Sequence, residues 1–306
     1  MTPPHRYQLQ PYKTSNSRYI CPQCQQPHTF TRYIDTQTNL HLNDAVGRCT
    51  REHNCGYHYT PKQFFGNHPE AGVVNHYQPI DAARKYPDLG PSLIPNTEVN
   101  QSLRNYADNN LVTYLCRLFG DEAIHQLADL YHIGTSNHWP GASIFWQIDA
   151  RGKARTGKIM LYHAHTGKRV KQPYNHIQWV HTKLYAGYYL QQCLFGEHLL
   201  NTHPNKPVAV VESEKTALIA ALHLPQYIWL ATGGLHNLNP AKCQVLKGRK
   251  VILYPDVNAF TQWQQKAHDL QLLLPGTIIT VSNYLELNAT ELQRHEGWDF
   301  ADYLTG

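Results

Sequence analysis

The chain has 306 residues, of which 42% are hydrophobic, and its formal net charge is +5 at pH 7. These values are typical of a folded protein with room for two or three domains, and they exclude a disordered chain. No apolar stretch approaches the roughly 20 residues that span a bilayer, and no signal peptide is recognisable at the N-terminus. We therefore expect a cytoplasmic protein with reduced cysteines, whose mild positive charge permits a polyanionic partner.

Two cysteine pairs lie in residues 1–65, which we expect to form the first domain. A Cys-x-x-Cys turn comes first, residues 29–34 alternate like a strand, and a more widely spaced pair follows. This layout predicts a zinc ribbon with one structural zinc ion on four thiolates: Cys21, Cys24, Cys49 and Cys55. Because the second spacing is irregular, His53 or His58 could replace one thiolate. The alternative is a cluster of reduced thiols without metal. The remaining cysteines are interpreted as buried packing residues: Cys116, Cys193 and Cys243.

A linker and a second domain are predicted next. Residues 66–100 are rich in Pro, Asn and Gly and lack periodicity, so they are predicted to be the linker. Residues 101–204 are predicted to form an α+β domain, with apolar residues at helical spacing in residues 103–119. Ala142–Ile148 is a strongly apolar strand, and a tight turn leads from it into a basic return strand. Residues 179–200 are expected to be rich in helix.

Basic side chains crowd this predicted hairpin and the residues after it. Aromatic residues such as Trp146 and Tyr162 are interleaved with them. The mixture suits a single nucleic-acid strand, whose phosphates attract positive charge and whose bases stack on aromatic rings. The alternative is a solvated, charged face without a ligand. The candidate nucleic-acid or nucleotide ligands are Arg151, Lys153, Arg155, Lys158, Arg169 and Lys171.

Two predicted strands in residues 205–306 each end in an acid: Glu212 follows Val208–Val211, and Asp256 follows residues 250–254. Strands and helices alternate here, which predicts an α/β fold with a parallel sheet and helices on both of its faces. The carboxyl ends of parallel strands meet at one edge, so the acids there are expected to hold Mg²⁺ or Mn²⁺. The alternative is that Glu212 or Glu214 only caps the helix that follows. The converging acids are Glu212, Asp256 and Asp299.

These residues resemble the Toprim domain, the metal-binding fold of primases, topoisomerases and some nucleases. Glu212 matches the strand-end glutamate of that family, and Asp256-Val257-Asn258 matches its Asp-x-Asp motif with Asn in place of the second acid. Gly297-Trp298-Asp299, with Asp302 one turn later, is similar to the third acidic motif of the primase branch. The resemblance implies that Glu212, Asp256 and Asp299 are catalytic. It also implies a magnesium ligand set of Glu212, Asp256, Asn258, Asp299 and Asp302.

Two details of this resemblance stay open. The Asn258 amide brings no charge to a metal, so a second metal position is not assured. Lys215, one turn into the helix after Glu212, is either a phosphate contact or a surface lysine.

The chain also resembles a Toprim-containing family found on mobile elements of Bacteroidetes-type bacteria. The shared sequence motifs are Trp139-Pro140-Gly141-Ala142, Lys158-Ile159-Met160-Leu161-Tyr162, Phe195-Gly196-Glu197-His198 and Val211-Glu212-Ser213-Glu214-Lys215-Thr216-Ala217. The order of a zinc ribbon, a basic hairpin and a Toprim-like sheet is similar to that of bacterial and phage primases.

The resemblances imply a primase-like protein that binds single-stranded DNA and nucleoside triphosphates. The zinc ribbon would read the template, and the acids would organise Mg²⁺ for attack of a 3′-hydroxyl on a nucleotide. A helicase or another replication or mobilisation protein is an expected partner, since no motor segment is recognisable in the chain. One alternative is a non-catalytic zinc- and DNA-binding factor with a degenerate Toprim domain. Another is a Toprim nuclease.

Overall fold

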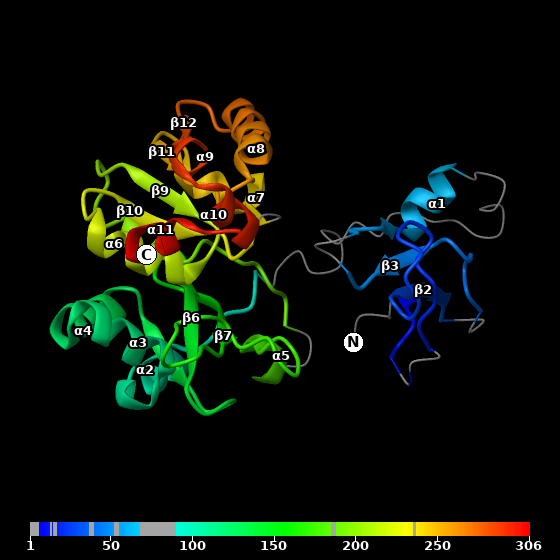
Figure 1. Ribbon diagram of the computed structural model, residues 1–306, viewed down its shortest axis with the longest axis horizontal. Coiled ribbons are helices and arrows are strands. Elements are labelled where there is room, and N and C mark those ends of the chain that lie inside the picture. Colours follow the sequence, from blue (N-terminus) through cyan, green and yellow to red (C-terminus); the bar gives the residue numbers. More distant parts are fainter. Residues whose placement is uncertain are drawn as a thin grey trace. The chain divides into compact units, whose positions relative to one another are not determined.

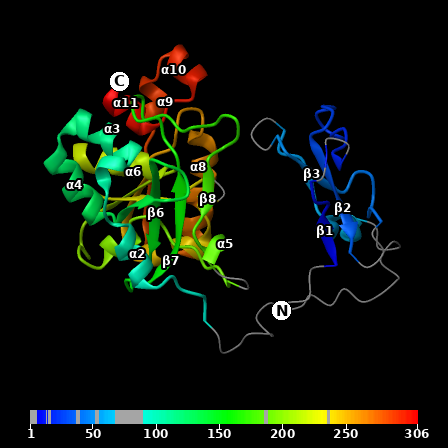
Figure 2. The same ribbon diagram turned by 90° about the horizontal axis from the view of Figure 1, so that it is seen from below.

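The computed structural model describes residues 6–12, 14, 17–36, 40–51, 55–67, 90–184, 188–234 and 237–306. The chain divides into two compact units, Met1–Asp88 and Leu89–Gly306 (Figures 1 and 2). None of the helices in the described residues has the length and apolarity of a membrane span.

The first unit is a small antiparallel sheet in the order β1-β2-β3-β4, followed by one helix. Its elements are β1 (Tyr7–Leu9), β2 (Phe30–Asp35), β3 (Gly47–Cys49), β4 (His58–Tyr59) and α1 (Pro61–Asn67). The strand predicted at residues 29–34 is β2. Its hydrophobic centre is small, with Phe30 packed between Cys21 and Cys49. A core of this size gives little stability without a covalent or metal cross-link.

An antiparallel sheet in the order β5-β6-β7-β8 begins the second unit. Its strands are β5 (Ile133–Ser136), β6 (Ala142–Ile148), β7 (Ala154–Met160) and β8 (Ile177–Trp179). Helices α3 (Asn110–Phe119) and α4 (Asp121–Leu130) pack on the face that carries Phe145, within one apolar cluster. Helix α2 (Asn96–Ser102) lies on the opposite face, where Val99 and Trp146 belong to a second apolar cluster.

A parallel sheet in the order β10-β9-β11-β12 completes the second unit. Its strands are β9 (Val208–Val211), β10 (Ile228–Ala231), β11 (Lys250–Leu253) and β12 (Ile278–Val281). Right-handed crossovers place α6 (Glu214–His223) and α8 (Phe260–Leu273) on opposite faces (Figure 1). The predicted parallel sheet with helices on both faces is confirmed. The other helices are α5 (His181–Leu184), α7 (Pro240–Cys243), α9 (Tyr284–Asn288), α10 (Glu291–Glu296) and α11 (Phe300–Thr305).

The two sheets of the second unit share one hydrophobic core, and Cys193 is also buried in this unit. The Tyr131 hydroxyl at the end of α4 donates to the carbonyl oxygen of Trp229 in β10, 3.0 Å away. Cys243 belongs to this core directly and Cys116 packs against it, in line with their interpretation as packing residues. The basic hairpin and the acidic strands are therefore held in a fixed relation by packing.

Three predicted segments differ from the structure. The predicted linker, residues 66–100, is described only at its two ends, since residues 68–89 lie outside the described ones. At its C-terminal end, Ile94 pairs with Ala154 and α2 begins at Asn96, so these residues belong to the second unit. The helix expected from residue 103 starts at Asn110, because the Asn109 side chain caps it by accepting from the N–H of Val112.

Residues 179–200, expected to be rich in helix, are mostly not helical in their described part. Helix α5 covers four residues, and a 3₁₀ turn covers Glu197–Leu200. Between them, the Phe195 N–H donates to the carbonyl of Ala231 at 3.0 Å, beside β10. The apolar residues here pack beside the edge of a sheet and do not form one side of a helix. The prediction of a helix-rich segment was therefore wrong.

Candidate functional site

The four predicted zinc ligands converge in the first unit. The sulfur atoms of Cys21, Cys24, Cys49 and Cys55 all lie within 4.8 Å of one another. The pair Cys21–Cys55 is 3.6 Å apart and the pair Cys24–Cys49 is 3.9 Å apart, and all four thiols are free of disulfides. Four soft sulfur atoms at these separations fit a tetrahedral zinc ion.

The backbone presets this arrangement. The N–H of Gln25 donates to the carbonyl of Cys21, which closes the Cys-x-x-Cys turn, and the N–H of Cys55 donates to the carbonyl of Arg51. The backbone N–H of Gln26 is the largest cause that lowers the pKa of the Cys24 thiol, to about 6. That thiol is therefore ready to ligate a metal near neutral pH.

His58 takes no part in this cluster. The His58 ring nitrogen lies 3.0 Å from the Tyr33 hydroxyl, and the two rings stack. His53 lies outside the described residues. Within the described residues, the four thiols therefore converge without a histidine ligand.

The predicted acids come from two neighbouring strands and one helix of the second unit. Strands β9 and β11 pair in parallel, so Glu212 and Asp256, which follow them, reach the same edge of the sheet. Asp299 caps α11 by accepting from the N–H of Asp302 at 2.9 Å. Its second oxygen accepts from the Thr216 hydroxyl at 2.7 Å, which fastens α11 to α6 beside that edge.

The pKa of Asp256 indicates an electrostatic interaction among these carboxylates. Its pKa is raised well above the usual range, first by burial and then by the charges of Asp299, Glu212 and Asp302. The positive charge of Arg169 lowers that pKa and offsets part of the rise. A carboxyl group surrounded by three others is stabilised by a proton or by a bound cation.

The carboxylate oxygens of these acids do not form a cluster of metal-ligand spacing. Within the described ranges, only the four cysteines bring three or more metal-ligating atoms within 4.8 Å of one another. The carboxylates therefore share an edge and an electrostatic field, and a divalent ion would have to draw their oxygens closer.

The two other predicted magnesium ligands have partners inside the protein. Asn258 adopts a left-handed conformation at φ +67°, and its amide nitrogen donates to the carbonyl of Arg294 at 2.9 Å. Asp302 accepts from the N–H of Asp299 at 3.2 Å and lies 3.6 Å from the Lys215 ammonium. Asn258 thus has a structural reason to be asparagine, since this residue tolerates left-handed turns.

The predicted basic residues separate into paired and unpaired groups. Arg155 pairs with the buried carboxylate of Asp149 at 2.7 Å, within the hairpin. The Lys158 ammonium lies 3.1 Å from both carboxylate oxygens of Glu214 and is buried. The remaining predicted residues are exposed or half-buried and have no ion pair within the described part of the chain: Arg151, Lys153, Arg169 and Lys171.

Sequence reasoning missed two buried groups next to the acids. Glu214, considered in the sequence only as an alternative helix cap, is 1% exposed, and from the start of α6 it binds Lys158 of β7. Lys242 is 7% exposed, and burial lowers the pKa of its amine to about 8. Its ammonium lies 3.5 Å from the carbonyl of Thr232, at the end of β10. Sequence reasoning gave Lys242 no role, because no recognised motif includes it.

Two family models match parts of the chain. A model described as a zinc beta-ribbon finger matches residues 5–70, in agreement with the four-cysteine cluster. A second model, described as a domain of unknown function (DUF6371), matches residues 109–257. No protein among the curated ones matches.

Several solved structures have a related arrangement at low sequence identity. One is the primase fragment of the bacteriophage T7 primase-helicase protein, with 16% identity, 92% of this chain and 99% of that chain covered, and a TM-score of 0.40. Another contains the zinc-binding and RNA polymerase domains of the Aquifex aeolicus primase, with 14% identity, 98% and 81% coverage, and a TM-score of 0.38. A third is the RNA polymerase domain of the Mycobacterium tuberculosis primase, with 11% identity, 66% and 80% coverage, and a TM-score of 0.41. These are distant similarities in fold, and the zinc ribbon is the part of the chain that a family model describes by its chemistry.

Proposed function

We propose that the protein is a primase-type nucleotidyltransferase that acts on single-stranded DNA. The observation that supports this proposal most directly is that Glu212 and Asp256 follow the paired parallel strands β9 and β11 to one edge of the sheet. Burial and the charges of Asp299, Glu212 and Asp302 raise the pKa of Asp256 there, and the charge of Arg169 lowers it. An edge with this excess of negative charge is suited to Mg²⁺ or Mn²⁺, and Arg169 is suited to a phosphate bound to that ion.

In this proposal, Glu212, Asp256 and Asp299 hold the metal at the carboxyl edge of the parallel sheet. The ion, when bound, would neutralise charge on the nucleotide and orient the attacking 3′-hydroxyl. Thr216 keeps the Asp299 carboxylate aimed at the edge, and Asp302 is a further ligand once it leaves Lys215. The attack forms an ester bond at the α-phosphate and releases pyrophosphate, with the hydroxyl proton passing to solvent or to Glu212.

Single-stranded DNA is the proposed template, held by the unpaired basic residues and read by the zinc ribbon. Arg151 and Lys153 lie at the turn of the β6–β7 hairpin, where their side chains are exposed. Exposed cations of this kind neutralise phosphates without sequence preference. A helicase or a mobilisation protein is the proposed partner, because the part of the chain described here offers no motor for strand opening.

The test is primer synthesis on single-stranded DNA with nucleoside triphosphates and Mg²⁺. Glu212→Gln and Asp256→Asn keep the side-chain size but remove a metal-binding charge, so synthesis should fall by about 100-fold or more. Glu291→Gln is the matched control, since Glu291 is exposed in the first turn of α10. Equal synthesis by the wild type and Glu212→Gln would remove this assignment.

A second function is favoured by the separation of the carboxylate oxygens and by the engaged Asn258 amide. In that case the protein is a non-catalytic zinc- and DNA-binding factor. DNA affinity would then be equal with and without Mg²⁺, and no synthesis would be seen. Incubation of DNA with Mg²⁺ or Mn²⁺ but without nucleotides separates both functions from a nuclease, which would cleave the strand.

A further inference from the structure

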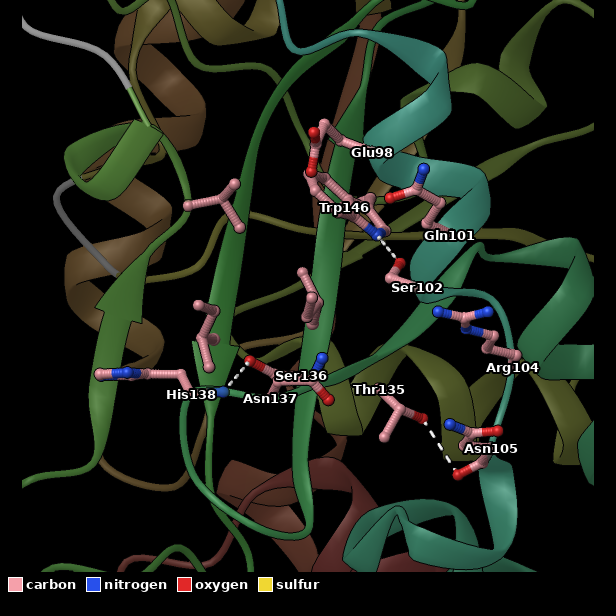
Figure 3. A pocket seen from close by; sticks show the side chains of 13 residues that line it. Glu98, Gln101, Ser102, Arg104, Asn105, Thr135, Ser136, Asn137, His138 and Trp146 are labelled. Carbon is pink, nitrogen blue, oxygen red and sulfur yellow. Dashed lines mark hydrogen bonds between the residues drawn. The ribbon is translucent and has the colours of Figure 1, made fainter.

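A pocket of about 440 Å³ lies on the face of the antiparallel sheet that is turned away from the acids (Figure 3). Side chains alternate along β7, so Lys158 reaches Glu214 on one side, whereas Ile159 packs with Ile144 on the other. Ile144 and Ile159 line the pocket, and none of the predicted site residues does. The pocket is therefore separate from the acidic edge and needs its own explanation.

Packing fixes the floor of this pocket. The Trp146 indole N–H donates to the Ser102 hydroxyl at 2.9 Å, and that hydroxyl donates to the carbonyl of Val99 at 2.7 Å. A Cβ atom at Gly157 would lie 2.7 Å from an Ile144 methyl group and 2.8 Å from the Trp146 ring. The absence of a side chain at Gly157 thus lets the indole lie against the sheet, and the floor is formed before any ligand binds.

The loop that forms another wall is also preset. The N–H of His138 donates to the Ser136 hydroxyl at 3.1 Å, and the Thr135 hydroxyl donates to the carbonyl of Asn105 at 3.4 Å. These hydrogen bonds join β5 and the turn after it to the residues that follow α2 (Figure 3). A ligand would therefore meet walls that are already in place.

The rim of the pocket carries polar side chains that form no ion pair or side-chain hydrogen bond with the other described residues. Arg104 is exposed, and neither it nor Glu98 has an ion-pair partner among the residues that the structure describes. The side-chain amides of Gln101, Asn105 and Asn137 lie around the same opening and make no side-chain hydrogen bond within those residues (Figure 3). One guanidinium, one carboxylate and three amides thus surround an apolar floor.

We propose that this pocket binds a nucleoside monophosphate. The Arg104 guanidinium offers the planar pair of donors that suits a phosphate. The side-chain amides can each donate to and accept from one edge of a base, while the apolar floor supports the ring. Glu98 is an acceptor for the ribose hydroxyls. A volume of about 440 Å³ is within the range of small-molecule sites.

The proposal does not depend on the acidic edge, and it is tested without Mg²⁺. The full chain, with its zinc, is titrated calorimetrically with AMP, GMP, CMP and UMP, and then with adenosine and with inorganic phosphate. We expect saturable binding of at least one nucleotide, with adenosine and phosphate each binding more weakly. Arg104→Ala should weaken nucleotide binding about tenfold or more and leave adenosine binding unchanged.

The matched control is Lys247→Ala, which removes an exposed cation of the same unit that does not line the pocket. Arg104→Lys should recover part of the affinity, because lysine keeps the charge but loses the paired donors. A short 5′-phosphorylated oligonucleotide identifies the source of the ligand: tighter binding than the mononucleotide indicates a strand end, and weaker binding indicates a free nucleotide. No saturable binding of any nucleotide at millimolar concentration, or equal binding by Arg104→Ala and Lys247→Ala, would overturn the proposal.

Discussion

The buried ion pair between Lys158 and Glu214 connects the two sheets, and its removal should have unequal effects from its two ends. The Lys158 ammonium is 3.1 Å from Glu214, and the side chains are 10% and 2% exposed. Lys242 lies close enough to Glu214 for that charge to raise its pKa. Glu214 is therefore the anion that faces two buried lysines.

Glu214→Ala leaves both ammonium groups without this counter-charge. Removal of one partner of a buried ion pair costs about 3–5 kcal/mol, so the free energy of unfolding should fall by that amount. Lys158→Met leaves Glu214 with the charge of Lys242 nearby, so its cost should be smaller, about 1–3 kcal/mol. The double variant Lys158→Met/Glu214→Ala should lose less than the sum of the single variants, because no half of the pair is left buried.

Tryptophan fluorescence during urea unfolding measures this effect in the intact chain. All 6 tryptophans lie beyond residue 138, so their emission reports the second unit alone. Lys247→Ala, an exposed lysine, controls for the loss of a positive charge. A loss below about 1 kcal/mol for Glu214→Ala would refute the reasoning, and so would a larger loss for Lys158→Met than for Glu214→Ala.

Three further predictions concern the metal, the buried lysine and the DNA. Metal analysis should find one zinc per chain, and its removal by a chelator should expose residues 6–67 to proteolysis while tryptophan emission stays unchanged. Burial depresses the pKa of Lys242 to about 8, so the unfolded state binds more protons between about pH 8 and 10.5. The wild type should therefore gain stability over that range relative to Lys242→Met, in urea unfolding at a series of pH values. Arg151→Ala and Lys153→Ala should each lower the salt dependence of single-stranded DNA affinity by about one phosphate contact, in titrations at several salt concentrations.

The parallel sheet could be predicted closely because each of its strands is a short apolar run followed by a polar turn. The first strand, Val208–Val211, has the predicted bounds, and all four of its residues are fully buried. The acids at the ends of β9 and β11 could be placed at one edge from topology alone. Parallel neighbours share the direction of their carboxyl ends, so no knowledge of side-chain packing was required.

Partners of charged side chains could not be predicted, because they depend on how the two sheets dock. Lys158 was interpreted as a ligand for nucleic acid because it lies among other basic residues, yet it binds Glu214 at the start of α6. Asn258 was interpreted as an altered metal ligand, and its backbone angle gives a local reason for the residue. Charge density in a sequence shows that positive residues are near one another, but it does not show which of them face solvent.

The two acids that follow β9, Glu212 and Glu214, have different roles that the sequence alone does not distinguish. Glu212 and Glu214 are two positions apart, and Ser213 between them caps α6 by accepting from the N–H of Thr216. The helix start turns Glu214 into the interior toward Lys158, whereas Glu212 stays half-buried and contributes to the raised pKa of Asp256. One acid therefore fixes the basic sheet beside the edge, and the other is left for a cation. For this reason, loss of Glu214 should lower stability, whereas Glu212→Gln should lower synthesis at unchanged stability, and a common effect of both changes on unfolding would contradict this division.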